Sequence, residues 1–253
     1  MSPTSSLQNR SEKATRIHEM FSDVAPRYDL LNDLISFGRL HAWRKECVRQ
    51  SLARPGQSVL DLATGTGDLA LEFKRKVGGS GKVLGTDFNE KMLDQAPAKA
   101  KTAGLEVEFE LADATQLSYP DSNFDITSIA YGIRNVDRPD QAIREMCRVT
   151  RPGGRVMVLE TGQSTIPGFR ALFRFYFGRV MPLLAGLLGG NVSAYQYLQK
   201  SAGEFPSGEK FAELMRNNGT FESVTVTPLF FGVTYLYCGV KAGAHPTANH
   251  SSS

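Results

Sequence analysis

The sequence is poor in the features that mark secreted, membrane-spanning and nucleic-acid-binding proteins. Its three cysteines, Cys47, Cys147 and Cys238, are far apart, which excludes a disulfide framework and zinc-binding spacing and fits a reducing compartment. The net charge is only +3, from 29 basic and 26 acidic residues without a lysine–arginine block, so we expect no nucleic-acid partner. Residues 1–13 have no apolar core of the kind found in secretory signals. These absences predict a cytoplasmic protein.

The most apolar stretch, residues 166–190, is interrupted by Arg170, Arg174 and Arg179. A bilayer-spanning helix needs about 20 consecutive apolar residues, so this stretch is not expected to be one. Two interpretations of its aromatic composition stay open: an insertion packed on the core, or an apolar wall for a hydrophobic substrate or a membrane surface. The second would add peripheral contact with the inner face of the cell membrane.

What the chain does contain is the composition of one globular α/β domain. Hydrophobic residues make up 41% and charged residues 22% of the 253 positions, enough for a single large core. We expect this domain over residues 14–241, between disordered tails at 1–13 and 242–253. An N-terminal helical arm should cover 14–55, and the apolar insertion 161–206.

The N-terminal arm itself has two interpretations. It either packs over the sheet as a structural element, or it forms a lid over a pocket and contributes Tyr28 and Asn32 to whatever binds there. The mixture of aromatic, acidic and amide residues from Phe21 to Asn32 shows no clean helical stripe, so the pattern does not decide between them.

Strands and helices alternate from residue 58 onward, which predicts a Rossmann-like, doubly wound, mainly parallel sheet of seven strands. The run at 124–131 is continuously apolar and β-branched, as expected for a strand buried on both faces. The last two strands have no helix between them, which predicts an antiparallel hairpin at the sheet edge. The expected strands are 58–63, 82–86, 107–111, 124–131, 155–159, 220–227 and 230–240, and the expected helices are 14–21, 43–52, 68–76, 90–103, 138–150 and 207–218.

A glycine-rich turn joins the first of these strands to its helix. Residues 59–68 read Val-Leu-Asp-Leu-Ala-Thr-Gly-Thr-Gly-Asp, which places Gly65 and Gly67 in the turn. Glycine adopts backbone conformations that are closed to other residues and leaves room for a ligand. Such a turn at the carboxyl end of a parallel strand is typical of nucleotide-class sites, although tight strand-to-helix turns also need glycine for structural reasons alone.

Three acidic residues lie at or near the ends of predicted strands around this turn. Asp61 precedes the turn and can orient it or offset a positive charge on a ligand. Asp87 lies 20 residues after Gly67, where a carboxylate can accept hydrogen bonds from both ribose hydroxyls of a nucleoside. Asp113, followed by Ala114, can meet an adenine edge. Each acid alone is typical of a cap or turn, whereas three around one glycine turn predict a nucleoside ligand.

The residue that follows the turn, Asp68, bears on the choice of nucleoside. Dinucleotide folds place a pyrophosphate at the start of this helix. A carboxylate there repels a phosphate and suits a cationic ligand such as a sulfonium. The sequence therefore favours S-adenosylmethionine over NAD, and the absence of metal-binding spacing predicts no metal.

Four motifs carry a resemblance to known proteins. Residues 61–67 read Asp-Leu-Ala-Thr-Gly-Thr-Gly, and residues 148–155 read Arg-Val-Thr-Arg-Pro-Gly-Gly-Arg. Residues 28–38 read Tyr-Asp-x-x-Asn-Asp-x-x-Ser-Phe-Gly, and residues 132–136 read Gly-Ile-Arg-Asn-Val. The first two resemble motifs of class I S-adenosylmethionine-dependent methyltransferases. The other two, with Trp43, resemble the ubiquinone/menaquinone biosynthesis C-methyltransferase family.

This resemblance implies methyl transfer to a ring carbon of a polyprenylated quinol, as in the conversion of demethylmenaquinol to menaquinol. It implies that Tyr28, Arg134 and Asn135 lie near the reacting ring, where a fixed cation at Arg134 favours an ionised hydroxyl. Ala130 stands where some members of the family have a serine. The residues predicted to bind the cofactor are Asp61, Gly65, Thr66, Gly67, Asp87, Asp113, Ala114 and Ala130.

Other functions stay open on the sequence alone. The acceptor is alternatively the 2-polyprenyl-6-methoxy-1,4-benzoquinol of ubiquinone biosynthesis, or another lipid-like molecule. A non-catalytic scaffold that binds a nucleoside and an NAD-linked oxidoreductase are the remaining alternatives. The sequence does not decide the length of the prenyl tail or the oligomeric state, for which a homodimer is one option.

Overall fold

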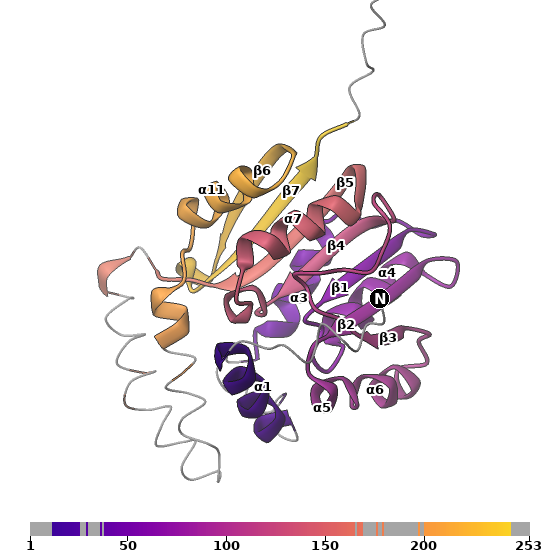
Figure 1. Ribbon diagram of the computed structural model, residues 1–253, viewed down its shortest axis with the longest axis horizontal. Helices are drawn as coiled ribbons and strands as arrows, with labels where there is room; N and C mark the ends of the chain where they lie inside the picture. The colour runs from indigo at the N-terminus through magenta and orange to yellow at the C-terminus, as the bar shows by residue number, and fades with distance from the viewer. Residues whose placement is uncertain are drawn as a thin grey trace, which may run out of the picture.

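The fold is organised around a seven-stranded sheet with strand order β3-β2-β1-β4-β5-β7-β6 (Figure 1). The computed structural model describes residues 12–25, 29, 36, 38–164, 166–168, 176, 179, 197 and 200–243. Strands β1 to β5 pair in parallel, and β7 pairs antiparallel with both β5 and β6. The predicted Rossmann-like sheet with an antiparallel hairpin at its edge is therefore confirmed.

The bounds of the elements follow the sequence pattern closely. The strands are β1 Ser58–Leu62, β2 Lys82–Asp87, β3 Glu108–Leu111, β4 Phe124–Ala130, β5 Thr150–Thr161, β6 Phe221–Leu229 and β7 Thr234–Lys241. The helices are α1 Glu12–Val24, α3 Leu40–Gln50, α4 Asp68–Val77, α5 Glu90–Leu93, α6 Ala96–Thr102, η3 Ile133–Asn135, α7 Pro139–Val149, α11 Glu209–Asn218 and η5 Phe230–Gly232.

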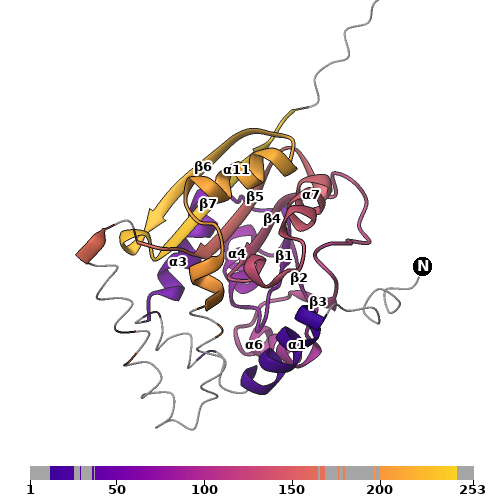
Figure 2. The ribbon, with the colours of Figure 1, turned by 60° about the vertical axis from the view of Figure 1, so that its left-hand side comes forward.

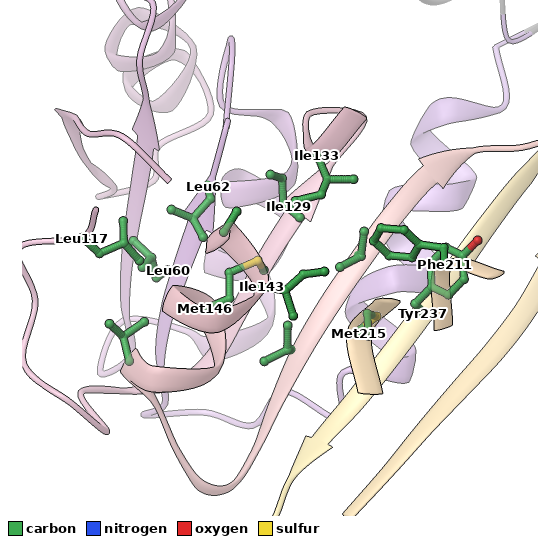
Figure 3. Packing of buried hydrophobic residues seen from close by; sticks show 14 of the residues in the cluster. Leu60, Leu62, Leu117, Ile129, Ile133, Ile143, Met146, Phe211, Met215 and Tyr237 are labelled. Atoms are coloured by element: carbon green, nitrogen blue, oxygen red, sulfur yellow. The ribbon is translucent and has the colours of Figure 1, made fainter. Parts of the chain in front are cut away.

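Side chains alternate between the two faces of the central strands, and each face has its own core. One core joins Leu60 and Leu62 of β1 to α7 and α11, with Met146 and Phe211 fully buried (Figure 3). The other core joins Val59 of β1 to α3 and α4. Because both faces are covered, the central strands have no free face, and the carboxyl ends of the parallel strands become the place where loops can form a site.

Several predicted boundaries differ from the structure. The strand expected from residue 230 begins only at Thr234, because residues 230–232 form the 3-10 helix η5. The helix expected over 90–103 is split into α5 and α6, because Pro97 has no N–H to donate to the carbonyl group of Leu93. Strand β5 begins at Thr150, earlier than the expected residue 155. Helix α11 begins at Glu209, since Gly208 takes the N-cap position and donates its N–H to the Tyr237 hydroxyl at 2.7 Å.

The described part of the N-terminal arm lies on two sides of the sheet. Helix α1 packs against α5, at the end of the molecule that carries α6 (Figure 2), and Asn89 donates its side-chain N–H to the His18 carbonyl oxygen at 2.8 Å. Helix α3 covers the face that carries α4, and Trp43 lies 6.3 Å from the ring of Phe230 in η5.

Much of the predicted apolar insertion, 161–206, lies outside the described residues. Within the part of the chain that the structure describes, no helix is both long and apolar enough to cross a membrane.

Candidate functional site

The glycine-rich turn between β1 and α4 has a backbone that is left-handed at several positions. Ala63, Gly65 and Gly67 have φ values of 48°, 58° and 88°. A left-handed alanine is strained, and such strain persists where the surrounding structure imposes it. At Gly67 a β-carbon would lie 3.0 Å from Ala96 Cβ and 3.1 Å from the ring of Phe109. Packing therefore requires glycine at this position independently of any ligand.

Asp87, at the carboxyl end of β2, holds this turn from the neighbouring strand. Its Oδ2 accepts the N–H of Gly65 at 2.8 Å, and its Oδ1 accepts the N–H of Asn89 at 2.9 Å. Burial raises the pKa of Asp87 to about 6, although the backbone hydrogen bonds oppose this shift. Each carboxylate oxygen keeps a lone pair that can accept a further donor.

Asp61 supports the turn from below. Its Oδ1 accepts the hydroxyl of Ser128 at 2.6 Å, and its Oδ2 accepts the hydroxyl of Thr64 at 2.7 Å. Burial raises the pKa of Asp61 to about 6, while hydrogen bonds and the charge of Arg44 lower it. At neutral pH both Asp61 and Asp87 are therefore largely ionised, which places two negative charges behind the turn.

The remaining predicted cofactor residues lie on adjacent strand ends. Asp87 is paired with Leu111 in the sheet, and its carbonyl oxygen accepts the N–H of Ala112 at 3.0 Å, so Asp113 and Ala114 follow directly. The carboxylate of Asp113 caps its own turn by accepting both the N–H and the hydroxyl of Thr115. Ala130 is the last residue of β4, beside β1.

Asp68 does not present the free negative charge that the sequence argument assumed. Its Oδ1 lies 2.5 Å from Lys99 Nζ, and its Oδ2 lies 2.8 Å from Arg44 Nη1. Lys99 Nζ also donates to Thr66 Oγ1 at 2.9 Å and forms an ion pair with Asp29 at 2.6 Å. The reasoning from Asp68 to a cationic ligand was therefore wrong, and the preference for a cation depends on Asp61 and Asp87 instead.

The Gly-Ile-Arg-Asn-Val motif lies directly against the glycine-rich turn. A β-carbon on Gly132 would lie only 2.5 Å from Ala63 Cβ, so only glycine permits this approach. Residues 133–135 form η3, which starts the connection from β4 to α7. The two motifs that are far apart in sequence thus meet at one end of the sheet.

Arg134 is buried and paired with a carboxylate. Its Nη1 lies 2.6 Å from Glu160 Oε1, with the two side chains 6% and 2% exposed. The same Nη1 donates to the carbonyl oxygen of Tyr131 at 2.7 Å. Arg134 Nε is buried and has no hydrogen-bond acceptor among the residues that the structure describes. The guanidinium is therefore held in place, and the carboxylate of Glu160 compensates its charge.

Asn135 contacts the apolar insertion. Its Oδ1 accepts the hydroxyl of Tyr197 at 3.1 Å, and its Nδ2 donates to the Tyr131 carbonyl oxygen at 3.4 Å. Burial raises the pKa of Tyr197, while the charge of Arg134 opposes that shift. Burial likewise raises the pKa of Tyr131, which senses the charges of both Arg44 and Arg134. Tyr131 is therefore within electrostatic range of Arg134 and of Arg44, and Arg44 also lowers the pKa of Asp61.

Sequence reasoning missed several residues of this site. Glu160 was read only as the end of a strand, although a charged residue that ends a run of buried apolar residues signals a functional position. Tyr197 follows the apolar stretch, in residues 191–200, and belongs to none of the motifs, and no local signal distinguished Arg44 or Lys99 from surface charges. Tyr28, the remaining predicted catalytic residue, lies outside the described residues.

The carboxylates around the turn and the guanidinium, amide and phenol of Arg134, Asn135 and Tyr197 lie at one end of the sheet. Over the described ranges of the chain, no three His, Cys, Asp or Glu residues are grouped so that they could hold a metal ion. The side chains that gather at this end of the sheet offer proton transfer and charge stabilisation.

Comparison with known proteins identifies relatives of the whole chain. A family model described as the ubiE/COQ5 methyltransferase family matches residues 9–241. The chain is 50% identical to the ubiquinone/menaquinone biosynthesis C-methyltransferase UbiE of Bdellovibrio bacteriovorus over 92% of this chain and 99% of that protein. It is 46% identical to a demethylmenaquinone methyltransferase of Thermus thermophilus, over 87% of this chain and 99% of that one.

Solved structures show the same fold at lower identity. A SAM-dependent methyltransferase from Thermotoga maritima, described as a possible histamine N-methyltransferase, superposes with a TM-score of 0.63 and 20% identity. The match covers 88% of this chain and 98% of that chain. At this identity the likeness concerns the fold alone.

Proposed function

Because this chain belongs to the ubiE/COQ5 methyltransferase family, we propose that it methylates a ring carbon of a prenylated quinol, with demethylmenaquinol as acceptor and S-adenosylmethionine as donor. One observation carries the proposal: Gly132 packs against Ala63, which brings Arg134 and Asn135 to the glycine-rich turn. Donor-side and acceptor-side groups therefore share one end of the sheet. The names of the Bdellovibrio and Thermus relatives support an acceptor of this class.

The residues around the turn fit a nucleoside that carries a positive charge. The free lone pairs of Asp87 would accept the ribose hydroxyls, and Asp113 with Ala114 would meet the adenine. Asp61, ionised above a pKa of about 6, would favour a cation over a phosphate. When bound, S-adenosylmethionine supplies an electrophilic methyl group attached to a positively charged sulfur.

On the acceptor side, the residues of this chain would activate and orient the ring. A ring carbon becomes a good nucleophile when the neighbouring hydroxyl loses its proton, and the guanidinium of Arg134 favours that anion. Asn135 and Tyr28 would hold the ring so that its carbon faces the donor, and this alignment supplies much of the rate. The carbon gains a methyl group and loses its hydrogen, the hydroxyl is reprotonated, and one proton is released overall.

The apolar insertion is proposed to hold the prenyl tail and to contact the membrane surface. In the described part, Ile166 and Phe231 of η5 are 45% and 57% exposed. The N–H of Gly162 donates to the carbonyl oxygen of Val233 at 2.8 Å, which joins the start of the insertion to η5. These two exposed apolar side chains are the described residues that a lipid tail would contact.

The test is turnover of purified protein with S-adenosylmethionine and a demethylmenaquinol analogue, followed by mass spectrometry of the product. We expect a product one methyl group heavier, and a parallel reaction with a prenylated methoxybenzoquinol measures the alternative acceptor. Failure to methylate any prenylated quinol would overturn the proposal. In cells, deletion of the gene should cause accumulation of the quinone that lacks this methyl group.

An Arg134→Ala variant separates quinol chemistry from that of other lipid-like acceptors. We expect turnover to fall by about 100-fold while cofactor binding is retained, because the proposal assigns Arg134 to the acceptor and not to the cofactor. Arg138, which is exposed four residues later, offers a matched control as Arg138→Ala. Equal activity of the two variants would contradict the role given to Arg134.

A further inference from the structure

Glu160 is held in one orientation at the carboxyl end of β5. Its Oε1 accepts hydrogen bonds from Arg134 Nη1 at 2.6 Å, from the N–H of Thr161 at 2.7 Å and from the hydroxyl of Thr161 at 2.9 Å. Its Oε2 lies 3.4 Å from the backbone nitrogen of Arg134. The carboxylate therefore cannot turn away from Arg134 without breaking several hydrogen bonds at once.

This arrangement uses one side of the Arg134 guanidinium and leaves another unused. Both N–H groups of Nη1 are occupied, one by Glu160 and one by the carbonyl oxygen of Tyr131. Arg134 Nε, also buried, has no acceptor in the described part of the chain. A buried donor without an acceptor is costly, so this edge of the guanidinium is suited to an oxygen atom that arrives with a ligand.

We propose that Glu160 is a positioning residue for methyl transfer. By fixing Nη1, it turns the Nε edge of Arg134 toward the quinol oxygen beside the reacting ring carbon. It also offsets the charge of the guanidinium, which lets Arg134 stay buried before the acceptor binds. This inference rests on the proposed function, because it requires an acceptor with a hydroxyl next to the methylated carbon.

A buried ion pair can also act as a purely structural link between η3 and β5, and kinetics distinguish the two roles. In Glu160→Gln the side chain keeps its shape but loses the charge-assisted hydrogen bond to Arg134. We expect kcat with the quinol to fall between about 10-fold and 100-fold, since a small misorientation of a catalytic group has this effect. The Kd for S-adenosylmethionine should change less than about twofold, because Asp87 and the turn are untouched.

Glu145→Gln is the matched control. Glu145 of α7 also forms an ion pair, with Arg148 at 2.8 Å, and accepts the N–H of Leu117 at 2.8 Å, but none of these partners is Arg134 or a group bonded to it. We expect its kcat to equal that of the wild type. If Glu160→Gln lowers kcat no more than Glu145→Gln does, or lowers it only in proportion to the folded fraction, Glu160 has a structural role and the inference is wrong.

A double-mutant cycle tests whether Glu160 acts through Arg134. Arg134→Lys keeps the positive charge but loses the planar array of guanidinium N–H donors. In this background, Glu160→Gln should cause little further fall in kcat. A full additional fall would overturn the inference. If Glu160→Gln does not fold, Thr161→Val can replace it, because it removes the hydroxyl that donates to Glu160 Oε1. A kcat of Thr161→Val equal to that of the wild type would then contradict the inference. Wild-type protein that methylates no quinol would instead refute the proposed function.

Discussion

Substitution of Gly67 by alanine should destabilise the protein more than a left-handed backbone alone explains. Gly67 has φ 88° and ψ 5°, a conformation that costs an L-residue about 1–2 kcal/mol. Its new β-carbon would also lie 3.0 Å from Ala96 and 3.1 Å from Phe109, and such overpacking costs about 1–3 kcal/mol. Because Phe109 can yield slightly, we take the lower part of both ranges and expect a total loss of about 2–3 kcal/mol.

Gly104→Ala provides the matched control for this prediction. Gly104 has φ 65° and no atom within 4 Å of its would-be β-carbon, so only the backbone term applies. We expect Gly104→Ala to lower the free energy of unfolding by about 1 kcal/mol. Urea unfolding gives the free energies of unfolding of the two variants. Calorimetry gives their affinity for S-adenosylmethionine, which should fall about tenfold for Gly67→Ala because the turn shifts. Equal losses in the two variants, or a loss below about 0.5 kcal/mol for Gly67→Ala, would refute the crowding argument.

Three further predictions concern charges and hydrogen bonds of the site. Burial raises the pKa of Asp87 from 3.8 to about 6, so its protonated form stabilises the fold below pH 4 and this contribution is lost as pH rises through about 6. Asp87→Asn should therefore flatten the pH dependence of urea unfolding while weakening cofactor binding, and an unchanged pH slope would contradict the assignment. Lys99→Met should lower the free energy of unfolding by about 1 kcal/mol and weaken cofactor binding severalfold. Lys101→Met, at an exposed position of the same helix, should change neither quantity. Equal effects of the two substitutions would show that the contacts of Lys99 contribute neither to stability nor to binding. Tyr197→Phe removes the hydrogen bond to Asn135 and should raise the KM for the quinol with an unchanged Kd for the cofactor, and a wild-type KM would exclude this contact from acceptor binding.

The sheet and its turn could be predicted because their signals are local. The run from Phe124 to Ala130 is mainly apolar and β-branched, with Asp125 and Ser128 as polar exceptions, and it is a strand covered on both faces. Gly67 marks the turn because its backbone conformation and its close packing both exclude a side chain. The break between α5 and α6 was missed, although Pro97 lies in the interior of the helix expected over 90–103, where proline interrupts a helix; in the structure it stands in the first turn of α6, where proline is tolerated.

The charges of the site could not be assigned from the sequence, because each depends on a partner from another element. Asp68 appeared to be a free carboxylate at a helix start, yet Lys99, 31 residues away, and Arg44 of α3 neutralise it. Arg134 was expected as a fixed cation beside the acceptor, and only the fold shows that Glu160, 26 residues away, accepts its hydrogen bond and compensates its charge. In both cases the charged residue was identified correctly and its electrostatic state was not.

By itself, the sequence determined the order of strands and helices, the position of the turn and the residues that approach it. These follow from periodicity and backbone preference, which are properties of neighbouring residues. Only the tertiary structure decided which charges are compensated, which donor of Arg134 is left for a ligand and that Gly132 lies against Ala63. Coulomb and packing energies depend on distance in space, and the fold sets that distance between residues that the chain keeps far apart.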